Sequence, residues 1–152
     1  MPTTEVRQAV EEFLRFFEDA SPGKEADTRL RQLLDRLAYV MHDAPDLFDP
    51  REFPEPPVRD SRSLYTRAST LFPNLGNYNV AMDVANRIGE SECGVGDAID
   101  DLADISADLY EAKWRWQNTS HADAVFHLRL NHSSHWGLHL RNLQLYLAVL
   151  GD

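Results

Sequence analysis

Three histidines and a tryptophan lie within nine residues near the end of the chain, in HSSHWGLHL, residues 132–140. Imidazole nitrogens bind transition metals, transfer protons and pair with carboxylates. At about 100° per residue, His132, His135 and His139 share one strip of a helix. Leucines occupy most of the remaining circumference, which is typical of a helix inside a bundle. We therefore expect the rings to be buried or half-buried, and Gly137 to mark a place where another backbone or ring packs closely.

A second candidate for chemistry is an acidic stretch that begins with GDAIDDLADI, residues 96–105. Between Arg87 and Lys113 the chain has eight acidic residues and no basic one. Helical projection gathers six of them within an arc of roughly 100°, here called the acidic stripe: Asp97, Asp100, Asp101, Asp104, Asp108 and Glu111. Apolar residues fill the opposite side, so the stripe is expected to face mainly solvent and to attract a cation or a basic protein surface.

The two stretches together suggest a metal site. Helical bundles bind metals through carboxylates and histidines that project from facing helices. One hypothesis therefore makes His135 and His139 nitrogen ligands, and Asp101 and Asp104 oxygen ligands, of a divalent metal. The expected orientation of the acidic stripe argues against this metal site, because carboxylates that face solvent cannot contact histidines that face the core. This objection is weakest for Asp101, which lies at the edge of the arc. The alternative is that backbone, serine or tryptophan groups satisfy the histidines.

Another hypothesis is a magnesium-dependent, all-α nucleotide pyrophosphohydrolase, in which acids on two helices hold the ion. Asp97 with Asp100, or Asp101 with Asp104, imitates one half of that arrangement. The other half would need a glutamate pair on a second helix. The run Glu11, Glu12 and Glu18 lacks the required spacing.

Apolar spacing predicts the elements that would position these residues. Helices are expected over residues 5–17, across Leu30–Met41, and over 61–71, 97–117 and 122–150, with Ser120 capping the last. Five prolines make residues 43–60 an irregular connection on the surface, and residues 72–96 are expected to form loops that cap one end. No alternating run supports a strand. The expectation is one all-α domain over residues 1–152, an up-and-down bundle of four or five helices.

Composition narrows the class of protein. Fifteen basic and 25 acidic residues give a net charge of −10, which disfavours nucleic acid as a partner. The single cysteine, Cys93, excludes an intrachain disulfide and fits a reducing compartment. Neither a signal-peptide pattern nor a long apolar run is apparent, so we expect a cytoplasmic protein without a membrane segment.

Three motifs, LFPNLGNYN (71–79), GDAIDDLADI (96–105) and HWGLHL (135–140), occur in that order. From about Ser61 onward, the chain resembles a family of small bacterial proteins catalogued as a domain of unknown function. The resemblance implies a helical bacterial cytoplasmic protein whose hallmark positions lie in the second and third motifs. It implies no activity, substrate or catalytic residue.

Two functional interpretations follow. The preferred one is a non-enzymatic binding or interaction module whose acidic face meets a basic partner, with homodimerisation through the leucine-rich final helix. The alternative is a metal-dependent enzyme with a His/Asp site or a magnesium-type site. The candidate functional face comprises the following residues: Asp97, Asp100, Asp101, Asp104, Asp108 and Trp136.

Overall fold

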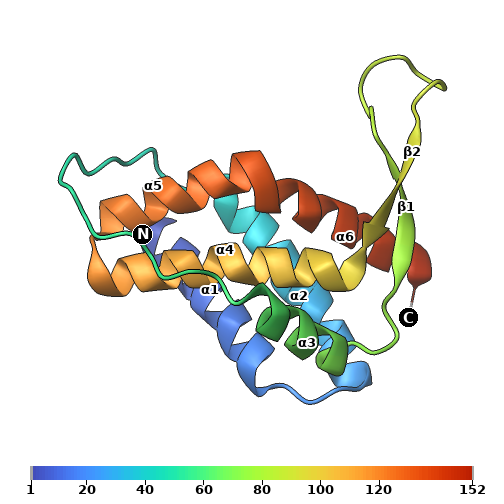
Figure 1. The fold of residues 1–152 in the computed structure, drawn as a ribbon, viewed down its shortest axis with the longest axis horizontal. Coiled ribbons are helices and arrows are strands. Elements are labelled where there is room, and N and C mark those ends of the chain that lie inside the picture. The colour runs from blue at the N-terminus through green and yellow to red at the C-terminus, as the bar shows by residue number, and fades with distance from the viewer. Residues whose placement is uncertain (1, 152) are drawn as a thin grey trace.

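The computed structural model describes residues 2–151 and confirms the predicted all-α bundle (Figure 1). The helices are α1 (Pro2–Asp19), α2 (Lys24–Met41), α3 (Ser61–Leu71), α4 (Ala98–Asn118), α5 (His121–Asn131) and α6 (Gly137–Leu150). A π-helical turn, η1 (His132–Trp136), joins α5 to α6, so the described residues form five helical stretches. Within this range, no helix has the length and apolar character needed to cross a membrane.

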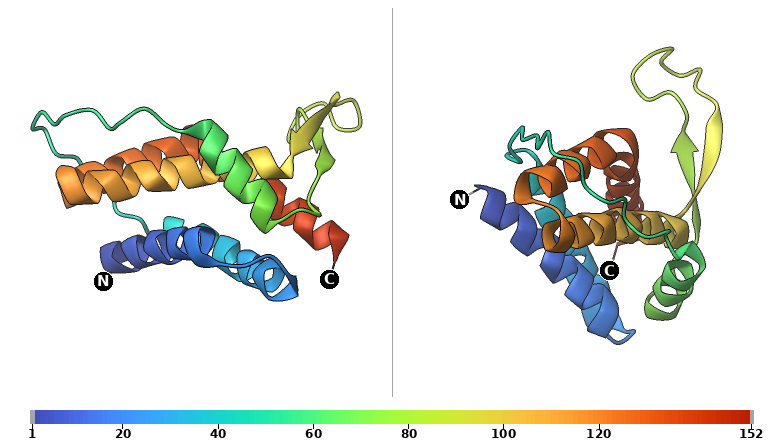
Figure 2. Two further views of the ribbon diagram at one scale, coloured as in Figure 1. Left: turned by 60° about the horizontal axis from the view of Figure 1, so that its bottom comes forward. Right: turned by 60° about the vertical axis from the view of Figure 1, so that its left-hand side comes forward.

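The helices pack in two layers (Figure 2). α1 and α2 form one layer, and α4 with α5 forms the other, while α3 packs on α4.

Side chains cap the starts of α4 and α5. The Asp97 carboxylate accepts hydrogen bonds from two amides of the first turn of α4, and Ser120 Oγ accepts one from the amide of Asp123. Ser120 is therefore the N-cap of α5, as predicted.

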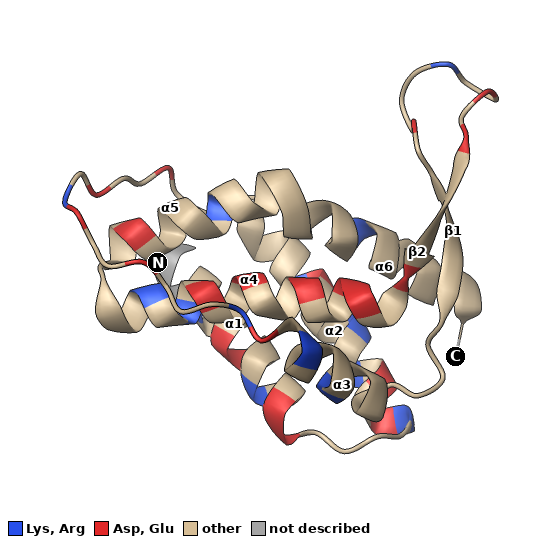
Figure 3. Cartoon of the chain, in the orientation of Figure 1, with Lys and Arg blue, Asp and Glu red and all other residues tan. Residues whose placement is uncertain are grey.

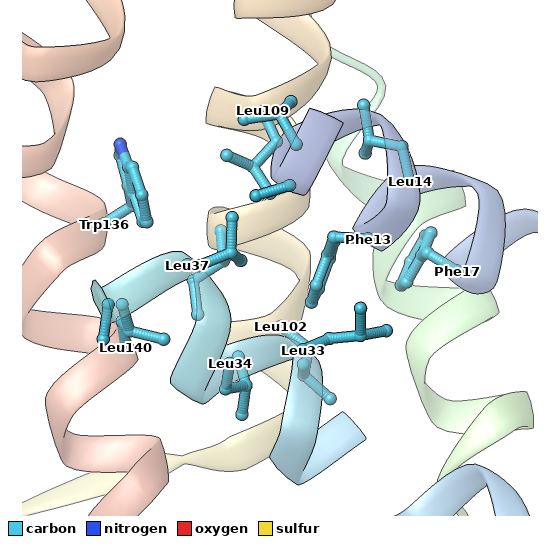
Figure 4. Packing of buried hydrophobic residues seen from close by; sticks show 14 of the residues in the cluster. Phe13, Leu14, Phe17, Leu33, Leu34, Leu37, Leu102, Leu109, Trp136 and Leu140 are labelled. Carbon is cyan, nitrogen blue, oxygen red and sulfur yellow. The ribbon is translucent and has the colours of Figure 1, made fainter. Parts of the chain in front are cut away.

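The core lies between these layers (Figure 4). Phe13 and Phe17 of α1 pack near Leu33 and Leu37 of α2, and each of these side chains is almost completely buried. Burial of one such side chain stabilises the fold by about 1.5–3 kcal/mol. Trp136 is also fully buried, and its indole N–H donates to the carbonyl of Leu128 at 3.2 Å. Trp136, predicted on the candidate functional face, thus lies in the core.

The proline-rich connection, residues 43–60, runs along the outside of the bundle, and we call it the strap (Figure 1). Phe48 packs edge-on against Phe126 of α5, with ring centroids 5.3 Å apart. Asp46 pairs with Arg129 at 2.9 Å. These contacts attach the strap to α5.

The absence of strands was a wrong prediction. β1 (Asn77–Ala81) and β2 (Cys93–Asp97) form an antiparallel hairpin that projects from one end of the bundle instead of capping it (Figure 1). The register pairs Tyr78 with Gly96, and a Cβ on Gly96 would lie 2.4 Å from the Tyr78 ring. Glycine is thus required beneath the ring, although glycine in a sequence indicates a loop more often than a strand.

Candidate metal centre

The acidic stripe does not face mainly solvent, which corrects the predicted orientation. Asp101 and Asp108 are only 4% and 1% exposed. Their side of α4 is covered because α4 is the central helix, contacted by α1, α3, α5, η1 and α6. A helix surrounded in this way cannot keep its whole polar side in water. Figure 3 shows acidic residues spaced along the side of α4 that faces the viewer.

The two buried carboxylates each bind a histidine of the facing helix. Asp108 Oδ2 lies 2.6 Å from Nδ1 of His135, and Asp101 Oδ1 lies 2.7 Å from Nδ1 of His139. Because an ionised carboxylate can only accept, Nδ1 is the donor in both rings. The lone pair of each neutral ring is therefore on Nε2. The rings are half-buried, as predicted, but their partners are carboxylates and not backbone, serine or tryptophan groups.

The two free nitrogens lie close to the same carboxylate oxygen. Oδ2 of Asp104 is 3.7 Å from Nε2 of His135 and 3.5 Å from Nε2 of His139. One ligand atom from each of the three residues can be chosen so that all lie within 4.8 Å of one another. In a tetrahedral zinc site with bonds near 2.0–2.1 Å, neighbouring ligands are about 3.3 Å apart. The two distances to Asp104 are close to this value, whereas a separation at the 4.8 Å limit would have to shorten by about 1.5 Å.

The structure divides the hypothesised ligands into two kinds. Asp104, His135 and His139 can converge on one ion, and we call them the triad. Asp101 lies behind His139 and orients it, and Asp108 does the same for His135. Asp97 caps α4 and also accepts a hydrogen bond from the hydroxyl of Tyr65 at 3.1 Å, so it serves the fold. His132 does not join the triad, because its ring packs against Trp136.

Two further residues contact the orienting carboxylates, and neither was recognised in the sequence. The Tyr78 hydroxyl donates to Oδ2 of Asp101, and the Arg59 guanidinium pairs with Oδ1 of Asp108. Tyr78 belongs to the motif LFPNLGNYN, which was the available signal. Arg59 lies among the prolines of the strap, where no pattern distinguishes it.

The π turn shapes the helix that carries both histidines. The amide of Gly137 donates to the carbonyl of His132, five residues earlier. A Cβ on Gly137 would lie 2.4 Å from that carbonyl oxygen and 3.0 Å from the His132 ring. The predicted close packing at Gly137 is thus confirmed. Single π turns within α-helices occur frequently at functional sites.

The carboxylates around His139 make the electrostatic environment of the centre favourable for a positive charge. The hydrogen bond to Asp101 raises the pKa of His139 despite the opposing effect of burial, and the charges of Asp101, Asp104 and Asp100 add to it. Burial raises the pKa of Asp100, and the charge of Asp104 raises it further. A carboxylate cluster of this kind lowers the energy of a bound positive charge.

The glutamates of α1 do not complete a magnesium-type site. Glu11 pairs with Arg7 at 2.8 Å, and Glu12 pairs with Arg29 at 3.6 Å. Glu18 accepts a hydrogen bond from the hydroxyl of Tyr110 at 2.7 Å. The contacts of α1 therefore give no support to the pyrophosphohydrolase hypothesis.

No family model and no curated protein matches the sequence. Among solved structures, the chain is similar to the crystal structure of protein BF1032 from Bacteroides fragilis, with a TM-score of 0.78 and 19% identity. The match covers 98% of this chain and 91% of that chain. At this identity, the likeness shows that the two chains share a fold and nothing about activity.

Proposed function

We propose that this protein binds a divalent transition-metal ion through Nε2 of His135, Nε2 of His139 and the carboxylate of Asp104. The observation that carries the proposal is that two histidines, each fixed by its own buried carboxylate, direct their free nitrogens to the same oxygen. A histidine that binds a metal usually donates its other N–H to a carboxylate or carbonyl, which fixes the tautomer and the ring.

Simple ion pairing explains this arrangement less well. A histidine–aspartate pair needs one carboxylate for each ring, and Asp101 and Asp108 already supply them. Asp104 would then add a third negative charge beside two rings that are already paired. A cation bound between Asp104 and the two Nε2 atoms would neutralise the negative charge of the Asp104 carboxylate. Two imidazoles and one carboxylate suit zinc, iron(II) or manganese.

The triad would leave coordination positions for water or a substrate. Structural zinc sites use four protein ligands, whereas catalytic sites use three and keep one position open. The triad residues remain partly exposed, so solvent reaches the centre. This supports the metal-dependent enzyme over a purely structural role for the ion, with a metal-bound water as the reactive group.

Metal titration of tag-free, chelator-treated protein tests the proposal. Isothermal titration with Zn²⁺, Mn²⁺ and anaerobic Fe²⁺ should detect one site per chain for at least one ion. His139→Ala and Asp104→Asn should each abolish that binding. His127→Ala is the matched control, because His127 also lies beside an aspartate, at 3.3 Å from Asp123. Absence of binding to the wild type, or equal binding by all variants, would contradict the proposal.

A second candidate function, the interaction module, is supported by the exposed side of α6. Leu138, Leu145 and Val149 recur at helical spacing and are 66%, 64% and 79% exposed. Exposed apolar patches of this kind mark contact sites, here for the predicted homodimer. Light scattering at two protein concentrations tests for this homodimer, and a monomer at both concentrations argues against it.

The proposal also includes a bacterial cytoplasmic setting, and the reducing conditions of a cytoplasm suit the exposed free thiol of Cys93.

A further inference from the structure

We infer that Tyr78 and Arg59 are positioning residues of the metal centre, through which the hairpin and the strap control how tightly the ion is held. The inference rests on the proposed metal binding and extends it to regulation of the same site. Neither residue belongs to the triad. Each contacts the carboxylate that orients one of the two histidines.

Tyr78 fixes Asp101 from the side opposite His139. Oδ1 of Asp101 accepts from the imidazole, and Oδ2 accepts from the Tyr78 hydroxyl. The Tyr78 ring stacks on Tyr146 of α6 with centroids 4.8 Å apart, and the Tyr146 hydroxyl accepts from the amide of Gly76 at 3.1 Å. The base of the hairpin is thus attached both to α6 and to the carboxylate behind His139.

Arg59 has the corresponding role for His135. Oδ2 of Asp108 accepts from the imidazole, and Oδ1 pairs with the guanidinium. Arg59 also contacts Glu111 at 3.1 Å, which Arg115 holds from the other side at 3.2 Å. The last residues of the strap are therefore attached to the carboxylate behind His135.

The two halves of the centre have the same design although their outer residues differ in chemistry. In each half an orienting carboxylate uses one oxygen for the histidine and the other for a residue outside the main helices. If ordering the hairpin or the strap favours metal binding, metal binding must favour their order by the same free energy. A molecule that moves either segment would then change metal affinity.

Matched hydroxyl and guanidinium deletions test the inference. Tyr78→Phe keeps the ring stack and removes the donor, whereas Tyr65→Phe removes a hydroxyl that binds Asp97, which contacts neither histidine. Arg59→Gln breaks the link to Asp108, whereas Arg129→Gln breaks a strap contact, to Asp46, that does not reach the centre. Removing direct partners of ligands typically costs 10–100-fold in metal affinity. One contact further out, we expect about 3- to 10-fold weaker Zn²⁺ binding for the first variant of each pair only.

Two additional measurements separate positioning from general stability. In the metal-free protein, Tyr78→Phe should shift the ring ¹⁵N resonances of His139 more than those of His135, and Arg59→Gln should do the reverse. Adding Tyr78→Phe to Asp101→Asn should weaken Zn²⁺ binding no further, because the hydroxyl acts through that carboxylate.

The outcomes distinguish the two proposals. If the wild type binds no Zn²⁺, Mn²⁺ or Fe²⁺, the proposed function and this inference fall together. If the wild type binds and the variants Tyr78→Phe and Arg59→Gln bind equally well, only the inference is overturned. It is also overturned if Tyr65→Phe and Arg129→Gln weaken binding as much as their counterparts.

Discussion

Two histidine–carboxylate arrangements lie along the helical stretch from α5 to α6, and they differ in where the carboxylate comes from. His127 lies beside Asp123 of its own helix, and that carboxylate is already bound by Arg115 at 3.0 Å and by Thr119 at 2.7 Å. His135 and His139 bind carboxylates of α4, a separate helix. In the first arrangement, the Asp123 carboxylate is occupied by neighbouring side chains of α4, of α5 and of the turn between them. The second directs two free nitrogens to one oxygen of Asp104. Similar residue pairs thus differ in geometry when the carboxylate comes from a facing helix.

The largest expected effects come from neutralising the carboxylate in each arrangement. Asp101→Asn should weaken metal binding by about 10–100-fold, because it removes the partner that orients His139. Asp123→Asn should leave metal affinity unchanged but lower the free energy of unfolding by about 1–3 kcal/mol, because buried Arg115 loses one of its two carboxylate partners and keeps Glu111. Titration calorimetry and urea unfolding measure the two effects. A loss of metal affinity in Asp123→Asn would remove the distinction between the arrangements.

A smaller effect is expected from filling the space beside the π turn. Gly137→Ala places a methyl group against the His132 carbonyl and ring, so the turn must shift, at a cost of about 1–3 kcal/mol. Metal affinity should fall as well, since His135 and His139 flank the distorted position. Gly76→Ala is the control, because nothing lies within 4 Å of its added Cβ. Thermal unfolding with and without Zn²⁺ would report both, and unchanged binding in Gly137→Ala would show that the turn does not set the geometry.

The smallest expected effect is on pH dependence. The folded-state pKa of His139 is raised, so its protonation stabilises the metal-free fold at low pH, and this contribution is lost as pH rises through that pKa. Burial lowers the pKa of His132, so protonation of that ring opposes folding, and the free energy of unfolding decreases as pH falls through the pKa of the unfolded chain. His139→Gln should therefore cost more stability at pH 5.5 than at pH 8.5, and His132→Gln the reverse. Urea unfolding at both pH values measures each difference, and matching signs would contradict the assignment.

Metal affinity should increase with pH, whereas the stability that protonated His139 gives to the metal-free protein decreases with pH. A metal requires the unprotonated ring, so protons compete with the ion. Zn²⁺ affinity should rise with pH across the range in which His139 loses its proton.

Much of the fold could be predicted because helices are local. Apolar spacing predicted α3, and the start of α5 followed from its Ser120 cap. The hairpin was missed because five-residue strands give little periodicity, and because Gly96 lacks a side chain for a reason found only in the partner strand. For the candidate site, the residue types and their helical spacing indicated Asp104, His135 and His139. Their meeting could not be predicted from either helix alone.

The sequence by itself determined which side chains share a helical face, because a fixed rotation per residue places Asp101, Asp104 and Asp108 on one side of α4, and His135 and His139 on one side of the last helix. Tertiary packing decided which way those faces point. α4 is central and contacts helices on several sides, so its polar side became part of an interface instead of remaining in water. Burying the carboxylates of Asp101 and Asp108 requires hydrogen-bond donors, and the facing histidines, together with Tyr78 and Arg59, supply them.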